Sequence, residues 1–519
     1  MPKIKEEIIA YAAEKELLID SKAVLLLEEK IDWKNFLEKC IERQIFWINE
    51  EAIFNLEQEE KTRKQNPELQ SKVEKSLTEE PTVRIEFTAF KPLAKDIEQN
   101  YKIMHEYDVT HQSGTQGKVK DFLNYFQQKF LELETLLKKH PSFKPKEIKK
   151  MRIVSKNNEV DFIGMVSEKW ITKNGHMGIR LEDLESSCIG LVMKDDRKLM
   201  KEKELIMPDN VIGVKATKAS DELFIIKEIF WPDIPQRSER KIEEDVAIAG
   251  VSDIHVGSKL FLEKSFNEFL EWMNGRVESQ KELEQLGKIK YLVITGDLCD
   301  GIGVYPGQFD ELSITDIFEQ YRVFEEYMLK IPEYVEVFVI PGNHDAVRNA
   351  DPQPSLPKKL VPELYKMKNF HFLSSPGWLE IEGMKTVLYH GGSLHDLFSK
   401  VSFLSAAEPA KGCVELLRKR DFMTSYGMRK PYVPEKRDFM TIHEEPDLVF
   451  LGDHHRRNYA FYRGTTVINN STFQARTAYQ VKLGHIPTPG IIPIINLQTR
   501  KISEREFAEP VQVANEYHN

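Results

Sequence analysis

The chain has 519 residues, of which 41% are hydrophobic and 30% are charged, and its formal net charge is −10. This length exceeds what one compact core can organise, so we expect several domains. The acidic balance argues against a protein that holds DNA alone over a long surface, since such proteins are usually basic. Any contact with nucleic acid is therefore expected in a local cleft, through metal ions, or with help from a partner.

No apolar run reaches the roughly 18–20 residues that a membrane helix needs. The N-terminal stretch MPKIKEEIIAYAAEKELL lacks the apolar core and the cleavage site of a signal peptide. The cysteines lie far apart and form no CxxC pair; they are Cys40, Cys188, Cys299 and Cys413. We expect no membrane contact, no disulfide framework, no structural zinc site and a reducing, cytoplasmic compartment.

Residues 1–57 predict a small helical module, because the apolar residues of EEIIAYAAEKELLI and AVLLLEEKIDWKNFLEKCIERQIFWI recur at helical intervals. Residues 58–82 contain almost no large apolar side chains and are interpreted as a flexible linker. A solvated helix that continues the module is the alternative for this stretch.

Residues 83–150 are interpreted as a helical and connecting region. The segment TVRIEFTAF is a possible strand, and residues 117–140 predict an amphipathic helix. The apolar side chains of this helix recur at steps of three and four; they are Phe122, Tyr125, Phe126, Phe130, Leu133 and Leu136. An aromatic stripe can stack on bases, but this spacing favours a face that packs against a core.

Residues 151–235 contain about five short apolar segments separated by polar turns, with one helical interruption at KDDRKLMKEKELIMPDN. This pattern predicts a small Greek-key barrel of the OB type. Such barrels bind single-stranded nucleic acid or serve as docking modules. The strands carry no dense mixture of aromatic and basic residues, so the docking role is at least as well supported.

Residues 236–519 alternate between β-branched apolar runs and helical stretches. This alternation predicts an α/β layered domain with buried strands. Five of the apolar runs end in side chains that are able to bind metal ions. These sites are Asp253-x-His255, Gly296-Asp297, Gly342-Asn343-His344-Asp345, His390-Gly391 and Gly452-Asp453-His454-His455.

Residues that follow the strands of an α/β sheet gather at one rim, where ligands bind. Carboxylate, imidazole and amide groups together suit hard or borderline divalent ions. Two such ions ~3.5–4 Å apart form a clamp for phosphoester hydrolysis, with Asp297 as the natural bridging ligand. Each motif alone is weak, because a lone GD or DxH is commonly a turn, but all five in order indicate a metallophosphoesterase.

These motifs resemble those of the calcineurin-like metallophosphoesterase superfamily, whose pattern is DxH, GD, GNHD/E, H and GHxH, over residues 245–475. The segments GDLCDGIGVYPGQ, VIPGNHDAVR, YHGGSLHD and DVTHQSGTQGKVKDFLNYFQQKF are similar to those of the small subunits of archaeal family-D DNA polymerases. The resemblance implies a multidomain protein. Its α/β calcineurin-like domain would have two layered sheets and would follow an OB-like barrel and a helical module.

The resemblance also implies a 3′→5′ exonuclease that proofreads beside a large polymerising subunit. Such an enzyme would act on DNA with a single-stranded 3′ end and associate with the nucleoid. The resemblance assigns one metal ion to Asp253, His255, Asp297 and His455, and a second to Asp297, Asn343, His390 and Asp453. It gives His344 a role at the leaving oxygen, and Asp345 would orient the imidazole of His344.

Asp453 departs from the superfamily pattern, which has histidine at this position. The anionic oxygen should favour harder ions, and we expect Mn²⁺, with Mg²⁺ as the alternative. A register in which His454 is the ligand stays open. Eukaryotic relatives of these subunits have lost the metal motifs and serve as scaffolds, whereas nearly all the groups are present here, so we expect activity.

Several residues near the expected rim are candidates for substrate contacts. Arg348, Arg456 and Arg457 could clamp phosphates, and Tyr305 could stack on a base. Ordinary surface arginines and a packed tyrosine explain these residues equally well.

Two functions compete with the proofreading nuclease: a stand-alone phosphatase or phosphodiesterase, and a non-catalytic scaffold. The N-terminal module is expected either to reach another replication protein or to be dispensable.

Overall fold

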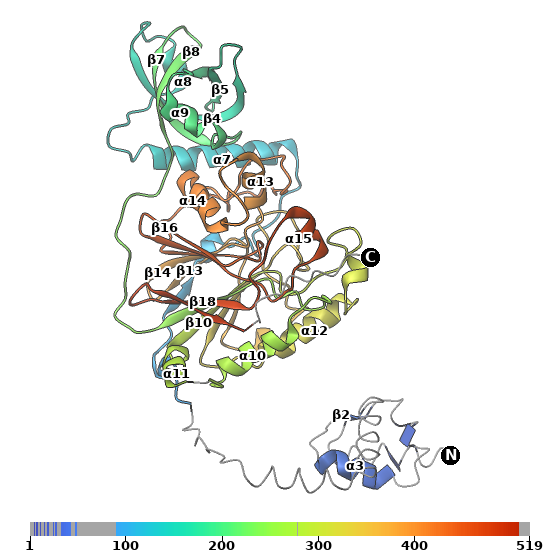
Figure 1. The fold of residues 1–519 in the computed structure, drawn as a ribbon. Helices are drawn as coiled ribbons and strands as arrows, with labels where there is room; N and C mark the ends of the chain where they lie inside the picture. The colour runs from blue at the N-terminus through green and yellow to red at the C-terminus, as the bar shows by residue number, and fades with distance from the viewer. Residues whose placement is uncertain are drawn as a thin grey trace. The chain divides into compact units, whose positions relative to one another are not determined.

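The computed structural model describes residues 90–277 and 279–507, together with scattered positions between 5 and 48 (Figure 1). The chain divides into two compact units, Met1–Thr88 and Ala89–Asn519. The elements described in the first unit are helix α3 (Trp33–Glu42) and the paired strands β1 (Leu18–Ile19) and β2 (Trp47–Ile48). The predicted linker over 58–82 and the predicted strand up to residue 89 lie outside the described residues.

Five strands of the second unit close into a barrel in the order β4-β5-β6-β8-β7. Side chains such as Phe162, Ile179 and Phe224 fill its interior and are fully buried. The five-stranded barrel predicted from the sequence is confirmed. Its strands are β4 (Glu159–Ile171), β5 (Met177–Glu182), β6 (Ser187–Val192), β7 (Val211–Lys218) and β8 (Leu223–Phe230). Helix α9 (Arg197–Lys201) and the 3₁₀ helix η2 (Glu202–Glu204) lie at the predicted interruption.

Helices α7 (Val119–Leu137) and α8 (Ile148–Met151) precede the barrel. One face of α7 is buried, and Tyr125, Phe130 and Leu133 on it are at most 5% exposed. The aromatic stripe therefore packs against a core, as its spacing predicts. Lys129 on the same face is fully buried and forms an ion pair with Asp421 at 2.5 Å.

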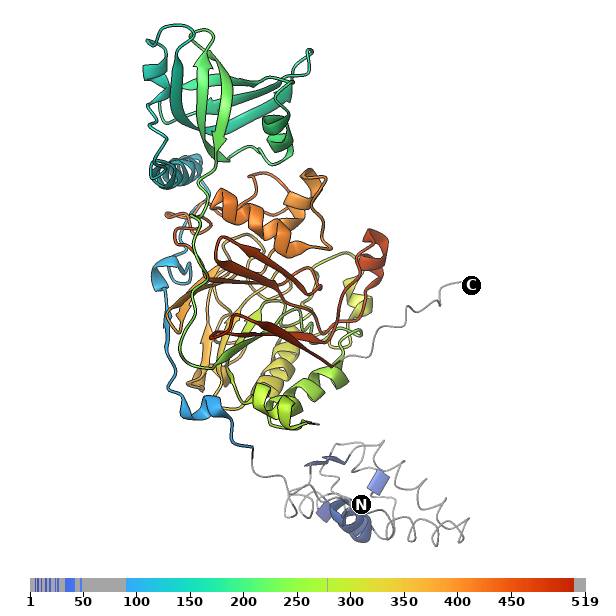
Figure 2. The ribbon, with the colours of Figure 1, turned by 60° about the vertical axis from the view of Figure 1, so that its left-hand side comes forward.

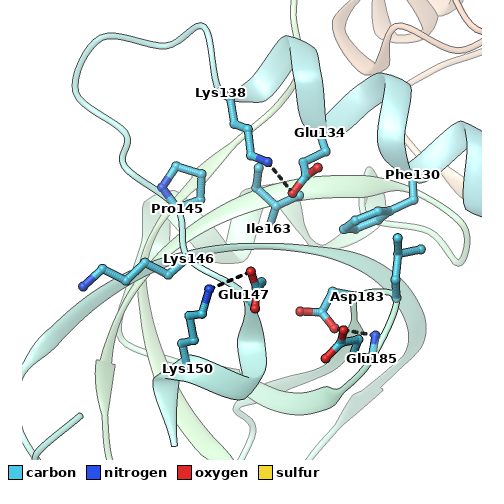
Figure 3. A pocket seen from close by; sticks show the side chains of 11 residues that line it. Phe130, Glu134, Lys138, Pro145, Lys146, Glu147, Lys150, Ile163, Asp183 and Glu185 are labelled. Atoms are coloured by element: carbon cyan, nitrogen blue, oxygen red, sulfur yellow. Dashed lines mark hydrogen bonds and ion pairs between the residues drawn. The ribbon is translucent and has the colours of Figure 1, made fainter. Parts of the chain in front are cut away.

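A cavity of about 420 Å³ lies between α7 and the barrel (Figure 3). It has several lysines in its wall, a feature that could suggest binding of a nucleic-acid strand. Lys138 pairs with Glu134 and Lys150 pairs with Glu147, both at 2.8 Å. Because two of the three lining lysines already pair with neighbouring carboxylates and only Lys146 has no such partner among the described residues, the cavity gives little support to strand binding by the barrel.

Two six-stranded sheets form the centre of the remaining chain. The first sheet has the order β12-β11-β10-β9-β18-β19, and the second has the order β16-β17-β15-β14-β13-β3. Strands of the first sheet are β9 (Ala247–Val251), β10 (Ile289–Thr295), β11 (Glu336–Ile340), β12 (Phe370–Phe372), β18 (Ile491–Asn496) and β19 (Ile502–Glu506). Strands of the second are β3 (Tyr101–Ile103), β13 (Gly377–Ile381), β14 (Met384–Leu388), β15 (Leu448–Leu451), β16 (Asn458–Tyr462) and β17 (Thr465–Asn469).

The strands that lead to the predicted motifs run parallel within each sheet. Strands β9, β10 and β11 are parallel neighbours in the first sheet, and β14 and β15 are parallel neighbours in the second. These strands are buried on both faces, so their sequences show apolar runs without alternation. The two sheets pack face to face through fully buried side chains that include Ile248, Phe338 and Phe450.

Helices cover the outer faces of both sheets (Figures 1 and 2). Helices α10 (Glu263–Met273), α11 (Gln280–Leu286) and α12 (Ile317–Met328) pack on the first sheet, while α13 (Leu394–Lys400) and α14 (Pro409–Lys419) pack on the second. The multidomain α/β class with layered sheets is thereby confirmed.

The remaining elements are α6 (Leu93–Asp96), η1 (His105–Tyr107), η3 (Gln308–Glu311), η4 (Leu364–Lys366) and α15 (Ala478–Leu483). Among the described helices, none has the length and apolar character needed to cross a membrane.

Strand β3 differs from the predicted organisation. It lies within residues 83–150, which the sequence suggests to be a connecting region, yet it pairs antiparallel with β13 at the edge of the second sheet. The ring of Tyr101 in β3 packs 5.2 Å from that of Phe338. A strand of three residues is too short to show a periodic pattern, so only its tertiary packing identifies it.

We predict that replacing Phe338 with alanine destabilises the α/β region by about 3–5 kcal/mol, because the ring fills the space between the sheets. The side chain is fully buried and contacts Tyr101, Tyr291 and His371. The measurement is the free energy of unfolding from chemical denaturation of the full chain. Phe461→Ala on β16 is the matched control, since that ring is 61% exposed and should change stability by less than about 0.5 kcal/mol. Equal losses in the two variants would contradict the packing described.

Candidate metal centre

The five predicted motifs meet at one edge of the two packed sheets. Asp253 and His255 follow β9, Asp297 follows β10, and Asn343 follows β11. His390, Asp453 and His455 come from the second sheet, after β14 and β15. The sequence therefore predicted the convergence correctly from strand ends alone. Of these seven side chains, Asp253, His255, Asp297, His390 and His455 belong to buried residues.

The backbone at this edge adopts an unfavourable conformation. Asp253, His255, Asp297, Asp453 and His455 all have φ between 52° and 68°. Residues with a side chain rarely adopt this left-handed region, and each instance costs of order 1 kcal/mol or more. Such backbone strain is typical of functional sites. Here the left-handed turns direct the side chains toward a common point.

Glycines allow these turns to approach one another. A Cβ atom at Gly342 would collide with the carboxylate of Asp297. A Cβ atom at Gly296, which has φ of 95°, would lie 2.6 Å from Nδ1 of His390. Both positions therefore require glycine for the carboxylate and the imidazole to reach the centre.

Asp253, His255 and His455 form a first group whose potential ligand atoms lie within 4.8 Å of one another. The Nε2 atoms of the two histidines are 3.1 Å apart. Nδ1 of His255 donates to the buried carboxylate of Asp300 at 3.0 Å, which leaves the lone pair of Nε2 directed at the group. The side-chain amide of Gln480 lies 2.9 Å from Nδ1 of His455 and holds that ring.

Asp297, Asn343, His390 and Asp453 form a second group. Nδ1 of His390 donates to the carbonyl oxygen of Thr295 at 2.7 Å. Its Nε2 atom then lies 3.0 Å from Oδ1 of Asn343, 3.4 Å from Oδ1 of Asp297 and 3.7 Å from Oδ1 of Asp453. The ring is thus fixed by a backbone carbonyl, with its free nitrogen among three oxygen atoms.

The charges in the cluster depend on one another. Burial alone would raise the pKa of Asp297, but His390 and the other imidazoles around it hold that pKa below its usual value. Burial would likewise raise the pKa of Asp453, and His395 beside it keeps that pKa well below the usual value. Burial lowers the pKa of His255, which favours the neutral imidazole that a metal requires.

The residues present fit a pair of divalent cations. Two carboxylates join the two groups. Asp253 lies within 4.8 Å of ligand atoms of Asp297 and His390, and Oδ2 of Asp297 lies 3.8 Å from Nε2 of His255 in the first group. Buried carboxylates this close repel one another unless positive charge lies between them. Carboxylate and amide oxygens with imidazole nitrogens are also the donor set that Mn²⁺ and similar ions accept.

His344 lies at the margin of the cluster. Its Nδ1 atom donates to the carbonyl oxygen of Asp300 at 2.7 Å. Its Nε2 atom lies 4.0 Å from Oδ2 of Asp297, and the residue lines a pocket beside the cluster. The imidazole is therefore close to the candidate metal ligands and also borders the pocket.

The sequence prediction that Asp345 orients His344 is wrong. The carboxylate of Asp345 forms no hydrogen bond with that imidazole and instead accepts from the backbone N–H groups of Gly342 at 2.8 Å and Leu298 at 3.2 Å. Asp345 thus joins the turn after β11 to the turn after β10. The carbonyl of Asp300 orients His344 instead, because the two turns lie side by side.

The two oxygens of Asp453 have different neighbours. Oδ1 is nearer His390, at 3.7 Å, whereas Oδ2 accepts from Nε2 of His395 at 2.7 Å. His454 packs beside His395, with ring centroids 4.6 Å apart, and its Nε2 atom is 3.7 Å from Oδ2 of Asp453. His455 therefore belongs to the first group, while His454, His395 and Asp453 form a further group whose potential ligand atoms lie within 4.8 Å of one another.

A pocket of about 400 Å³ opens beside the cluster. Tyr305, which the sequence suggested as a stacking residue, lines it. The other lining residues are His255, Asp297, Asp300, Val304, Pro306, Asn343, His344, Asn349, His395, Arg429, Asp453, His455, Gln474, Thr477, Tyr479, Gln480 and His485. His344 and five of the candidate ligands thus line the same pocket, whereas Asp253 and His390 do not; the five are His255, Asp297, Asn343, Asp453 and His455.

The predicted arginines do not line this pocket. Arg348 forms an ion pair with Glu435 at 2.8 Å and donates to Ser113. Arg456 donates to the carbonyl oxygen of Ile486 at 3.1 Å, and Arg457 pairs with Glu504. These guanidinium groups are bound to other parts of the chain, so the positions give no support to the predicted phosphate contacts.

Sequence reasoning missed several residues of the site. Asp300 and His395 stand inside segments that the sequence analysis quoted, GDLCDGIGVYPGQ and YHGGSLHD, but no spacing rule marks them as partners of the candidate ligands. Arg429, Tyr479 and Gln480 carry no sequence signal, because only the fold brings their loops to the pocket.

Comparison with known proteins agrees with this geometry. Residues 248–459 match the family model that describes the B subunits of DNA polymerases alpha and epsilon. The DNA polymerase II small subunit of Methanocaldococcus jannaschii is 37% identical over 80% of this chain and 70% of that protein. The small subunit of Methanothermobacter thermautotrophicus is 36% identical over 81% of this chain and 86% of that protein.

The chain belongs to the archaeal DNA polymerase II small subunit family. The family predicted from the motifs is confirmed. The corresponding subunit of Pyrococcus horikoshii is 35% identical over 79% of this chain and 67% of that protein. A solved archaeal phosphodiesterase aligns with 50% of this chain at 15% identity and a TM-score of 0.26, a likeness too weak to support an argument.

We predict that Asp300→Asn weakens Mn²⁺ binding by this small subunit about 10- to 100-fold, because the carboxylate orients His255. Titration calorimetry of the full chain measures the change without any assay of activity. Asp310→Asn is the control, since Asp310 is exposed on the nearby 3₁₀ helix η3 and does not line the pocket beside the cluster. Unchanged affinity in a folded Asp300→Asn protein would rule out this role of the carboxylate.

Proposed function

We propose that this small subunit is a metal-dependent 3′→5′ exonuclease that hydrolyses DNA phosphodiesters and proofreads for a DNA polymerase. One observation carries the proposal: seven potential metal ligands from five strand ends, with His344 beside them, line or adjoin one pocket of about 400 Å³. A scaffold does not need this arrangement, and the strained backbone that maintains it would be a cost without a function.

In this proposal, Asp253, His255, Asp297 and His455 hold one ion, and Asp297, Asn343, His390 and Asp453 hold the other. The two divalent ions, expected to be Mn²⁺ with Mg²⁺ as the alternative, would neutralise charge on the phosphate oxygens and acidify the attacking water. Asp300 and the carbonyl of Thr295 support this arrangement by fixing the rings of His255 and His390.

His344 acts on the leaving group in this proposal. Hydrolysis breaks the bond between phosphorus and the O3′ atom of the penultimate nucleotide, releasing a nucleoside 5′-monophosphate and a shortened strand. Because Nδ1 of His344 is held by the carbonyl of Asp300, only Nε2 of the imidazolium can give its proton to O3′. The side chain thereby balances the charge that develops on the departing oxygen.

The subunit would work with other molecules. The names of its relatives describe them as small subunits, which supports assembly with a large polymerising subunit. That partner would supply most of the affinity for DNA, which fits the net charge of −10 of this chain. Binding of other replication proteins by residues 1–57 stays a prediction.

We predict that the full chain in Mn²⁺ removes nucleotides from the 3′ end of a single-stranded or mismatched primer faster than from a matched primer. His344→Ala should lower the rate roughly 100- to 10,000-fold without weakening Mn²⁺ binding, because it removes the proton donor and no ligand. The measurement is the ladder of products from 5′-labelled DNA, followed with and without the large subunit. Chelation of the metal should abolish cleavage by the wild type.

Asp297→Asn provides the contrast, since it should weaken both Mn²⁺ binding and cleavage. Products that shorten from the 5′ end would exclude the proposed polarity. Absence of cleavage in every mixture, despite bound Mn²⁺, would favour the scaffold, and cleavage of phosphate monoesters alone would favour a phosphatase.

A further inference from the structure

Two tyrosines from separate segments of the chain stack against each other in the lining of the pocket. Tyr305 follows β10 and Tyr479 lies on α15, and their rings are nearly parallel, with centroids 6.4 Å apart and planes inclined by 20°. Both line the pocket. Tyr479 is 46% exposed, so a large part of its aromatic surface faces solvent.

The tyrosine pair lies close to the reacting centre. The ring of Tyr305 is 6.2 Å from the ring of His344, the residue proposed to act on the leaving oxygen. The hydroxyl of Tyr305 donates to Glu311 at 2.8 Å, which holds this ring in place. One ring of the pair is therefore fixed beside the cluster and the other is the more accessible.

Arg429 provides a positive charge in the same lining. Its guanidinium group donates to the hydroxyl of Tyr479 at 3.2 Å. Within the described part of the chain, no carboxylate pairs with this guanidinium group. This contrasts with Arg348, whose charge Glu435 neutralises. An exposed arginine beside a site for phosphodiesters is suited to a phosphate oxygen.

We infer that Tyr305 and Tyr479 form a clamp for the unpaired base of the 3′-terminal nucleotide, with Arg429 binding a DNA phosphate beside it. The inference rests on the proposed nuclease function and specifies its substrate as a single-stranded end. A base between two rings needs a spacing of about 7 Å, twice the contact distance of carbon atoms. The ring centroids are 6.4 Å apart, so the rings must separate to admit a base, and the more exposed Tyr479 is the ring expected to move.

The clamp explains why an unpaired end would be preferred. An aromatic ring can stack on the flat face of any base, so the clamp would bind a strand without regard to its sequence. A paired base is already stacked in the duplex and must be unstacked before it can enter. A mismatched terminal base is not held by pairing, so unstacking it costs less free energy and it would enter the clamp more easily.

We predict that Tyr479→Ala raises KM for a short single-stranded oligodeoxynucleotide about 5- to 100-fold with little change in kcat, because it removes a stacking surface. An oligonucleotide with an abasic 3′ terminus should show equal KM values with variant and wild type. Tyr479→Phe, which keeps the ring, should restore the wild-type KM within about twofold.

Tyr426→Ala is the matched control, because Tyr426 is 44% exposed and does not line the pocket. An unchanged KM of Tyr479→Ala for the base-bearing oligonucleotide would overturn the clamp. So would an equal loss on the oligonucleotide with an abasic 3′ terminus, since it would show that the substitution disturbs the cluster through Gln480.

Binding separates failure of the clamp from failure of the nuclease proposal. Fluorescence anisotropy of a labelled oligonucleotide with a 3′-terminal phosphorothioate linkage reports affinity without turnover. Weaker binding by Tyr479→Ala to the base-bearing end, and equal binding to the abasic end, would support the clamp even if the wild type cleaved nothing. Equal binding of variant and wild type to both ends would overturn it.

Discussion

The site depends on keeping several carboxylates buried together at the joint between two sheets. Asp253 and Asp300 are fully buried, and Asp297 is 2% exposed. Low polarity strengthens repulsion between such groups, so each needs a compensating partner. The backbone N–H of Asp453 donates to Asp253 at 3.1 Å, and His255 donates to Asp300 at 3.0 Å. These hydrogen bonds do not cancel all of the negative charge on the carboxylates. The remaining charge attracts cations to this edge.

The same edge holds the two sheets to each other. The hydroxyl of Thr295, at the end of β10, donates to the carbonyl oxygen of Leu451 in β15 at 3.0 Å and accepts from Asn470 at 2.9 Å. The link from Asp453 to Asp253 also crosses between the sheets. Left-handed backbone at the ligand positions is tolerable because the apolar core between the sheets over-determines it. The apolar packing between the two sheets therefore offsets the backbone strain that orients the ligand side chains.

The sequence predicted what depends on local order along the chain and missed what depends on tertiary contacts. A buried strand followed by Gly-Asp or Gly-Asn-His-Asp identifies both the strand and the end at which its polar groups lie. Nothing local reveals that Asp300, rather than Asp345, supports the histidines. Strand β3 was missed for the same reason, since three residues show no period. Arg348 illustrates the converse error, because position after a motif does not determine which way a long side chain points.

Helix α15 connects the mouth of the pocket to the cluster. Its six residues are too few for a stable isolated helix, so its position depends on a capping box between Thr477 and Gln480. Gln480 also holds the ring of His455, one of the candidate ligands, and Tyr479 is the adjacent residue. One short helix therefore carries both the exposed tyrosine and the residue that contacts this imidazole. If strand ends bind beside Tyr479 and ions bind in the cluster, any effect of one on the affinity for the other is reciprocal, and α15 is the element through which such coupling would pass.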